Sequence, residues 1–223
     1  MLREIIAVWK GESFMNKVVE EFVQMLKDAD SVFEKAWNIF KDSGVNEQTK
    51  SEIYEKDKSV NKKERKIRRM LLEHLSINPQ QDVSGCLAMI SLVKDAERIG
   101  DYAKNIFEVG ILMGDKLKDM QYITRLSDIQ SRINRHFITL TKAFTESDDT
   151  SAKKVLEDYK SIKEECNNVL NDLLNDSMSN KEAVSTALLS RYFKRINSHI
   201  SNIASGLVYP LDRIDFVRGD LLE

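Results

Sequence analysis

The sequence predicts an all-α fold in which two tandem, antiparallel three-helix bundles form an elongated molecule. The first observation is a scarcity of turn residues. The 223 residues include only 8 glycines and 2 prolines, where average usage gives roughly 15 and 11. β-Sandwiches, barrels and doubly wound sheets need more turns than this. The second observation is that apolar residues recur at helical spacing along nearly the whole chain, and the third is an internal repeat.

Breaks in the helical pattern divide the chain into six long helices. The breaks fall at residues 43–44, 77–81, 114–115, 147–149 and 175–180. The helices are therefore expected at roughly 13–43, 46–76, 83–114, 120–147, 149–175 and 181–207. These lengths exceed the usual ~11–12 residues of a helix, which favours elongated bundles over a globin-like packing.

Two distant segments share one residue pattern. Residues 94–106 align with residues 191–203, and both carry Arg-Ile and Asn-Ile at the same places. Each belongs to an apolar stripe of the kind that packs helices into bundles. The stripes are Leu92, Ala96, Ile99, Ala103, Ile106 and Leu189, Phe193, Ile196, Ile200, Ile203. The predicted units are an N-terminal extension (1–12), a first bundle (13–117), a second bundle (118–210) and a C-terminal tail (211–223).

Charge and cysteine content exclude several classes of protein. The 34 basic and 36 acidic residues give a net charge of −2, so nothing global favours nucleic acid or an anionic membrane as a partner. Cys86 and Cys166 stand alone, which argues against a disulfide framework or a thiolate metal site. The sequence shows no secretory signal and no run of about 18 apolar residues. We expect a cytoplasmic protein.

Sequence motifs for catalysis are also absent. None of His74, His136 and His199 follows a glutamate by three residues, so the Glu-x-x-His ligand set of di-iron bundles is missing. The sequence has no glycine-rich phosphate loop, no Gly-x-Ser-x-Gly elbow and no Cys/His arrangement for nucleophilic catalysis. We predict that the protein is not an enzyme.

Two pairs of oxygen-bearing side chains are candidates for a metal site. Glu97 and Asp101 share one helix face, and Asp57 and Asn61 form a similar pair on the preceding helix. These helices run antiparallel across a short turn, so the two pairs are expected at the same height. Oxygen ligands without imidazole or thiolate suit a hard or borderline divalent cation. The heptad pattern turns Glu97 and Asp101 toward solvent, so a plain solvated acidic face is the alternative.

A basic run and an internal glycine are also notable. Residues 62–69 (KKERKIRR) can contact phosphate or an acidic protein surface, but such a run is also typical of a solvated face whose aliphatic stems lie on the core. Gly100 lies inside a helix, where it costs ~1 kcal/mol against alanine. We expect a metal or a neighbouring helix to approach its backbone. Inter-helix ion pairs are expected from Arg98 and Arg195, and helix-packing hydrogen bonds from Asn105 and Asn202.

These residues resemble a known family. Residues 97–106 (ERIGDYAKNI) resemble the signature helix of the PhoU family, and residues 57–61 (DKSVN) resemble its second-helix motif. The resemblance implies a cytoplasmic, non-enzymatic protein that acts with a phosphate ABC transporter and a phosphate-sensing histidine kinase. Such proteins limit uptake and signalling when phosphate is plentiful. The resemblance also implies one metal cluster in each repeat, and it places the first at Asp57, Asn61, Glu97 and Asp101.

The second metal motif departs from the family pattern. Its equivalents are Tyr159, Lys163, Lys194 and Ser198, which include no carboxylate and two ammonium groups. We therefore expect iron, zinc or manganese at the first repeat only. Binding there is expected to be weak, because Asn61 replaces an acid.

Other functions are weighed beside this one. A divergent member of the family would serve another phosphate permease. A helical scaffold would keep the fold but neither metal nor phosphate control. A carboxylate metalloenzyme is disfavoured, because the acid pairs are expected to face outward. The stretch after Pro210 is expected either to pack on the second bundle or to form a homodimer contact, and the sequence does not decide between them. No nucleic-acid partner is expected, and contact with a membrane is expected through a protein partner only.

Overall fold

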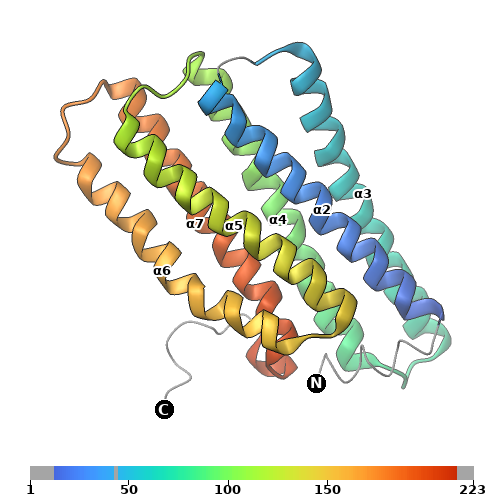
Figure 1. Ribbon diagram of the computed structural model, residues 1–223. Coiled ribbons are helices and arrows are strands. Elements are labelled where there is room, and N and C mark those ends of the chain that lie inside the picture. Colours follow the sequence, from blue (N-terminus) through green and yellow to red (C-terminus); the bar gives the residue numbers. More distant parts are fainter. Residues whose placement is uncertain (1–12, 43–44, 215–223) are drawn as a thin grey trace.

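The computed structural model describes residues 13–42 and 45–214, and all regular structure within them is helical (Figure 1). The elements are α2 (Ser13–Asp42), α3 (Glu47–Ile77), α4 (Val83–Met113), α5 (Met120–Glu146), α6 (Asp149–Leu173), α7 (Asn180–Val208) and the short 3-10 helix η1 (Leu211–Arg213). The all-α prediction is confirmed, and each long helix begins and ends within two residues of its expected position. Residues 1–12 and 215–223 lie outside the described part of the chain.

Short polar side chains fix the starts of four helices. In each case a side-chain oxygen accepts a backbone N–H of the first turn, which has no partner within the helix. The capping residues are Asn46, Asp119, Asp148 and Ser179. At the other end of α4, Gly114 has a φ of 63°, a left-handed conformation that glycine adopts without strain.

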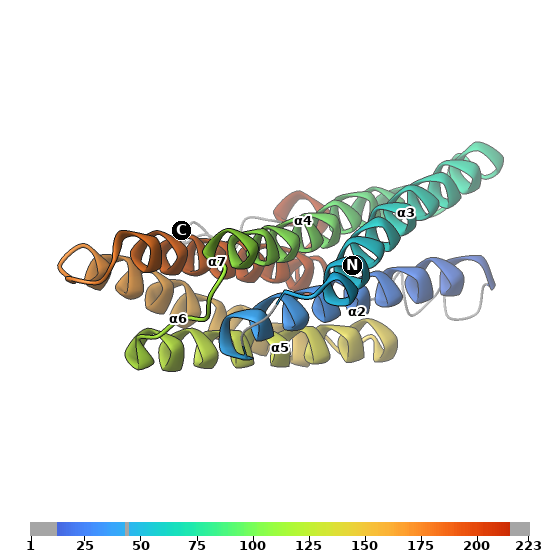
Figure 2. The ribbon, with the colours of Figure 1, turned by 90° about the horizontal axis from the view of Figure 1, so that it is seen from above.

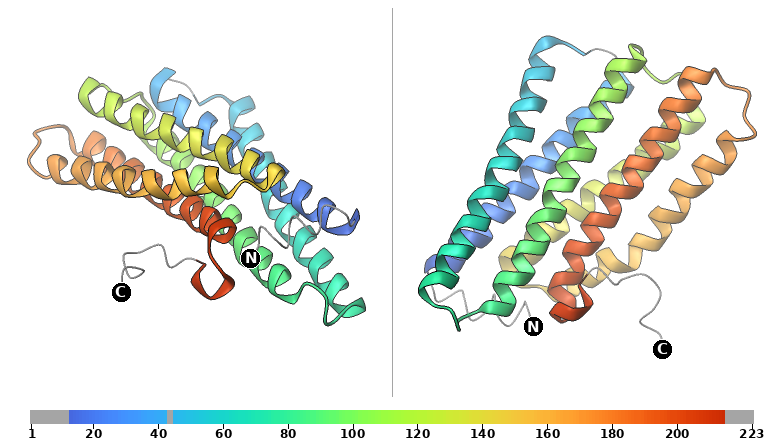
Figure 3. Two further views of the ribbon diagram at one scale, coloured as in Figure 1. Left: turned by 60° about the horizontal axis from the view of Figure 1, so that its bottom comes forward. Right: turned by 180° about the vertical axis from the view of Figure 1, so that it is seen from behind.

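The helices form two bundles that lie side by side. The first contains α2, α3 and α4, and the second contains α5, α6 and α7. Helices α4 and α7 run antiparallel along the middle of one face, where α3 flanks α4 and α6 flanks α7 (Figure 3). Helices α2 and α5 cover the opposite face (Figures 1 and 2). One broad face of the molecule is therefore built from four parallel or antiparallel helices.

Aromatic side chains join the two bundles into one core. Phe33 and Trp37 of α2 both meet the ring of Phe193 of α7, edge to face, at centroid distances of 5.2 and 5.4 Å. Phe22 of α2 meets Phe144 of α5 at 4.9 Å. All five side chains are fully buried, and such pairs contribute about 0.5–1.5 kcal/mol each beyond the area that they bury. The bundles are therefore expected to unfold together.

One charged contact recurs in both bundles with its signs exchanged. In the first, Asp28 of α2 accepts a hydrogen bond from Ser59 of α3 at 3.0 Å and pairs with two lysines of that helix. In the second, Arg132 of α5 donates to Ser161 of α6 at 2.9 Å and pairs with Asp158. The two serines are 102 residues apart and the two α2/α5 residues 104 apart. This correspondence supports an internal repeat.

The chain turns back after α7. Pro210 follows the last helical residues, and η1 packs against α4 of the first bundle. Ile214, the last described residue, is buried. Residues 211–214, the described part of the expected tail, follow the last helix of the second bundle but contact the first bundle.

Candidate functional site: two polar networks on helix α4

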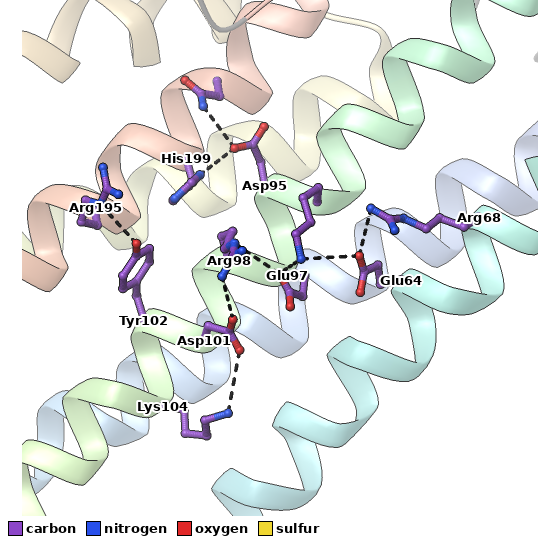
Figure 4. Close-up of polar contacts among 12 residues, drawn as sticks. Glu64, Arg68, Asp95, Glu97, Arg98, Asp101, Tyr102, Lys104, Arg195 and His199 are labelled. Carbon is purple, nitrogen blue, oxygen red and sulfur yellow. Dashed lines mark hydrogen bonds and ion pairs between the residues drawn. The ribbon is translucent and has the colours of Figure 1, made fainter.

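Helix α4 carries polar side chains on two of its sides. One set faces α3 within the first bundle, and the other faces α7 of the second bundle (Figure 4). Both sets lie in the middle of the broad face (Figures 3 and 4). The four predicted metal ligands belong to the set between α3 and α4.

The network between α3 and α4 begins at Lys104. Its Nζ atom lies 3.1 Å from Oδ2 of Asp57 on α3 and 3.8 Å from Oδ1 of Asp101 on its own helix. Arg98 approaches the other oxygen of Asp101 at 3.5 Å. Burial by itself lowers the pKa of Lys104, but its bond to Asp57 and the negative charges of Asp57, Asp101 and Glu108 together raise it. The ammonium group is therefore held charged between two carboxylates of facing helices, which confirms that Asp57 and Asp101 lie at the same height.

The network continues at Glu97, one turn before Asp101, and Glu97 pairs with Lys94. The Nζ atom of Lys94 lies 2.7 Å from Oε2 of Glu97 and 3.9 Å from Oε1 of Glu64 on α3. Arg68 pairs with the same oxygen of Glu64 at 3.2 Å. Sequence reasoning missed Glu64, although its position seven residues after Asp57 places both on one face of α3.

Glu97 is not solvent-facing, which corrects the expectation from the heptad pattern. Its exposed fraction is only 9%, and that of Asp57 is 8%. Asp101 is partly buried, and burial, followed by the negative charge of Glu97, raises its pKa. The heptad pattern shows only which residues face one neighbouring helix. Glu97 is buried because a second neighbour, α3, covers the side of α4 on which it lies.

Gly100 permits this close packing of α3 on α4. A Cβ atom at Gly100 would lie 3.1 Å from Cγ1 of Val60 on α3. Of the two expectations for this glycine, the approach of a neighbouring helix is therefore the one that the geometry supports.

The predicted ligands do not fit a metal ion as they are placed. In the part of the chain that the structure describes, no three or more His, Cys, Asp or Glu side chains converge in a way that could hold one. The carboxylates of Asp57, Glu97 and Asp101 are matched by basic side chains instead, and Asn61 donates its amide to the backbone carbonyl of Asp57. One oxygen of Asp57, Oδ1, is buried without a partner. A metal would have to displace Lys104 and Lys94.

The equivalent positions of the second bundle also lie together. The hydroxyl groups of Tyr159 and Ser198 are 3.4 Å apart, and Lys163 lies over the ring of Tyr159 at 5.9 Å. Lys194 donates to Asn167 at 2.6 Å. None of these four side chains is a carboxylate that could bind a cation. A metal site in the first bundle only therefore stays a prediction, and the chemistry of the second bundle supports it.

The second network on α4 joins the two bundles. Asp95 accepts hydrogen bonds from the side chain of Asn202 at 3.1 Å and pairs with Nδ1 of His199 at 2.6 Å. Arg195 donates to the hydroxyl of Tyr102 at 3.2 Å, and Tyr102 also stacks on His199. Sequence reasoning did not single out Asp95 or Tyr102. The residue pattern of one helix does not show which side chains of a distant helix its polar residues will contact.

The expectations for the paired arginines and asparagines are met in part. Asn202 forms the expected hydrogen bond between helices, whereas Arg195 reaches across to the hydroxyl and ring of Tyr102 instead of forming an ion pair. Arg98 pairs with Asp101 and Glu97 of its own helix, so the expected inter-helix ion pair is wrong for this residue. The structure gives the side chain of Asn105 no hydrogen bond within the described residues.

These features define a class of protein. It consists of two antiparallel three-helix bundles that pack together along their third helices, α4 and α7, and it carries ion-paired carboxylates between α3 and α4. The family model for the PhoU domain matches residues 22–109 and again residues 126–207. The chain therefore belongs to the PhoU family. Among the described helices, none has an apolar stretch of the length needed to cross a bilayer.

Individual relatives agree with this assignment. The chain is 27% identical over 192 residues to the phosphate-specific transport system accessory protein PhoU homolog of Aquifex aeolicus, covering 81% of this chain and 83% of that protein. The crystal structure of PhoU from Pseudomonas aeruginosa superimposes with a TM-score of 0.79 at 22% identity, covering 90% and 98% of the two chains. The phosphate transport system regulatory protein PhoU from Streptococcus pneumoniae gives 0.77 at 17% identity, covering 93% and 97%.

Proposed function

We propose that the protein is a cytoplasmic, non-enzymatic regulator of phosphate uptake and of phosphate-responsive signalling. It would act as a helical adaptor that binds a phosphate transporter and a sensor histidine kinase. The observation that carries the proposal is the match of both bundles to the PhoU domain. The Aquifex relative, named as an accessory protein of phosphate-specific transport, supports the same role.

The shape of the molecule suits an adaptor. Helices α3, α4, α7 and α6 form one broad face (Figure 3), and the aromatic core beneath it is shared by both bundles. A rigid, preformed surface loses little conformational entropy on binding. The ion-paired side chains of α4 would give this face polar contacts that select a partner.

A metal ion is not required by this proposal. Binding of iron, zinc or manganese at Asp57, Asn61, Glu97 and Asp101 stays a separate prediction, supported by the facing helices and by the unpartnered oxygen of Asp57. The ion pairs of Lys94 and Lys104 oppose it. Where a metal does bind, it would replace these ammonium groups as the positive charge between the carboxylates.

The alternative is a helical scaffold that keeps the fold but has lost phosphate control. The absence of carboxylates at the equivalent positions of the second bundle favours it. Co-expression of the tagged protein with the phosphate transporter and sensor kinase of its own cell, followed by affinity purification from detergent-solubilised membranes, separates the two. The adaptor is expected to retain both partners through a high-stringency wash. Loss of both, in a preparation where the tagged protein is folded, would favour the scaffold.

A further inference from the structure

The outward face of α3 carries a row of exposed cations. Lys58, Lys62, Arg65 and Arg69 follow one another at steps of 4, 3 and 4 residues, and all four are exposed. We call them the basic row. None forms an ion pair with a described carboxylate. The other basic residues of this stretch are paired: Lys56 and Lys63 with Asp28, Lys66 with Glu21, and Arg68 with Glu64. The basic row therefore consists of the cations of this stretch that have no ion pair with a described residue of the protein itself.

The basic row ends at exposed aliphatic side chains. Leu72 is the next residue of the same row and is 61% exposed. Ile77 at the end of α3 is 77% exposed, and Val83 and Leu87 at the start of α4 are 39% and 46% exposed. We call these four residues the apolar tip. The basic row is about 17 Å long at 1.5 Å per residue. The residues of the apolar tip follow in the last turns of α3 and the first turns of α4, and these two helices join at one end of the molecule (Figure 3).

We propose that the basic row and the apolar tip dock the protein directly onto an anionic lipid surface. Cations along one helix face attract anionic headgroups, and adjoining aliphatic side chains enter the boundary between headgroups and acyl chains. The net charge of −2 does not oppose this, because charges farther away than about 8 Å are screened at physiological salt. Contact with a membrane is then direct, where the overall charge had suggested contact through a partner only.

A lipid surface fits these residues better than an acidic protein does. The four cations lie along one helix and form no ion pair within the described residues, as suits a surface of many interchangeable charges. An acidic protein would gain nothing from a group of exposed aliphatic residues at one end of the row unless it also offered a matching apolar pocket. A bilayer supplies both environments, one above the other.

The second bundle provides an internal comparison. At the positions of α6 displaced by 102 residues from the basic row, the chain has Lys160, Glu164, Asn167 and Asn171. One cation, one acid and two amides form no basic row. Lipid binding is therefore expected through the first bundle only, with α3 lying along the membrane surface.

Co-sedimentation with sucrose-loaded vesicles tests this proposal without any protein partner, so its outcome is independent of the proposed phosphate role. The wild type is expected to pellet with phosphatidylcholine vesicles that contain 30% phosphatidylglycerol, and not with phosphatidylcholine alone. Each neutralised cation should lower the partition coefficient about fivefold. The variant Lys58→Gln/Lys62→Gln/Arg65→Gln/Arg69→Gln should therefore lose binding by a factor of several hundred.

A charge-matched variant provides the control. Arg135→Gln/Lys154→Gln/Lys160→Gln/Lys181→Gln changes four exposed residues that form no ion pair with a described carboxylate, and it should bind like the wild type. Circular dichroism checks that both variants fold. Three results would overturn the proposal: a wild type that ignores the anionic vesicles, an equal loss in both variants, or a wild type that binds polyglutamate through the basic row but not the vesicles.

Discussion

The contact between Asp95 and His199 is expected to stabilise the association of the two bundles. Their side chains are 10% and 18% exposed, and their Oδ1 and Nδ1 atoms are 2.6 Å apart. Asn202 donates to the same oxygen at 3.1 Å. The substitution Asp95→Ala removes both contacts, whereas His199→Ala removes one of them together with the stacking on Tyr102.

The magnitude of this effect follows from the number and type of bonds. A hydrogen bond to a charged group contributes about 1.5–3 kcal/mol. Asp95→Ala removes two such bonds and is therefore expected to lower the free energy of unfolding by about 3–6 kcal/mol. In a double-mutant cycle with His199→Ala, the coupling energy between the two side chains should be about 1.5–3 kcal/mol.

Urea unfolding followed by circular dichroism at pH 7 measures all four proteins of this cycle. The exposed pair Lys142 and Glu146 on α5, with side chains 63% and 56% exposed and 3.8 Å apart, is the control, and its coupling should stay below about 0.5 kcal/mol. A coupling between Asp95 and His199 no larger than that of the control pair would refute the reasoning.

Three other substitutions test packing, charge burial and metal binding. Gly206→Ala places a Cβ atom 2.8 Å from Cδ2 of Leu92, so urea unfolding should show a loss of about 1 kcal/mol, in which overpacking exceeds the gain in helix propensity. Burial, followed by the charge of Glu34, raises the pKa of Asp30 to about 7, so the folded state holds a proton that the unfolded state releases above about pH 4. Stability should therefore fall as pH rises from about 4 to 7, and Asp30→Asn should flatten this slope and stabilise the protein at pH 8 by about 1–2 kcal/mol. In calorimetric titration with Mn²⁺, Lys104→Gln should strengthen binding at least tenfold, because it removes the competing ammonium group, and adding Asp101→Ala should abolish it.

Each of these predictions has a contradicting result. In a Leu92→Ala background, Gly206→Ala should become neutral or stabilising, and an unchanged loss would show that the steric contact is not its cause. A stability profile of Asp30→Asn that parallels the wild type between pH 4 and 7 would contradict the raised pKa. Mn²⁺ binding by Lys104→Gln that is no tighter than by the wild type would contradict the competing role of that lysine. Two equivalent metal sites in the wild type would contradict the expected asymmetry between the bundles.

The helices were predictable because their signals are local. Capping residues such as Asn46 and Asp148 and the long apolar stripes act within one segment of the chain, so the ends of helices follow from the sequence alone. The equal height of Asp57 and Asp101 was also predictable, since a short turn between antiparallel helices fixes it.

The partners of the polar side chains were not predictable in the same way. A heptad pattern describes one seam, but α4 packs against α2, α3 and α7 at once, and so Glu97 is buried where solvent was expected. The bond from Asp95 to His199 joins residues 104 positions apart. Such contacts depend on how the two bundles are placed against each other, and residue spacing within one helix carries no information about that.

Phosphate uptake in phosphate-rich medium, compared between a strain that lacks the gene and the same strain complemented with it, tests the central claim most directly. Loss of the protein is expected to raise uptake and to release phosphate-regulated expression, and complementation should restore both. Uptake and expression that do not change when the gene is deleted would contradict a role in phosphate control and would leave the helical scaffold as the better account.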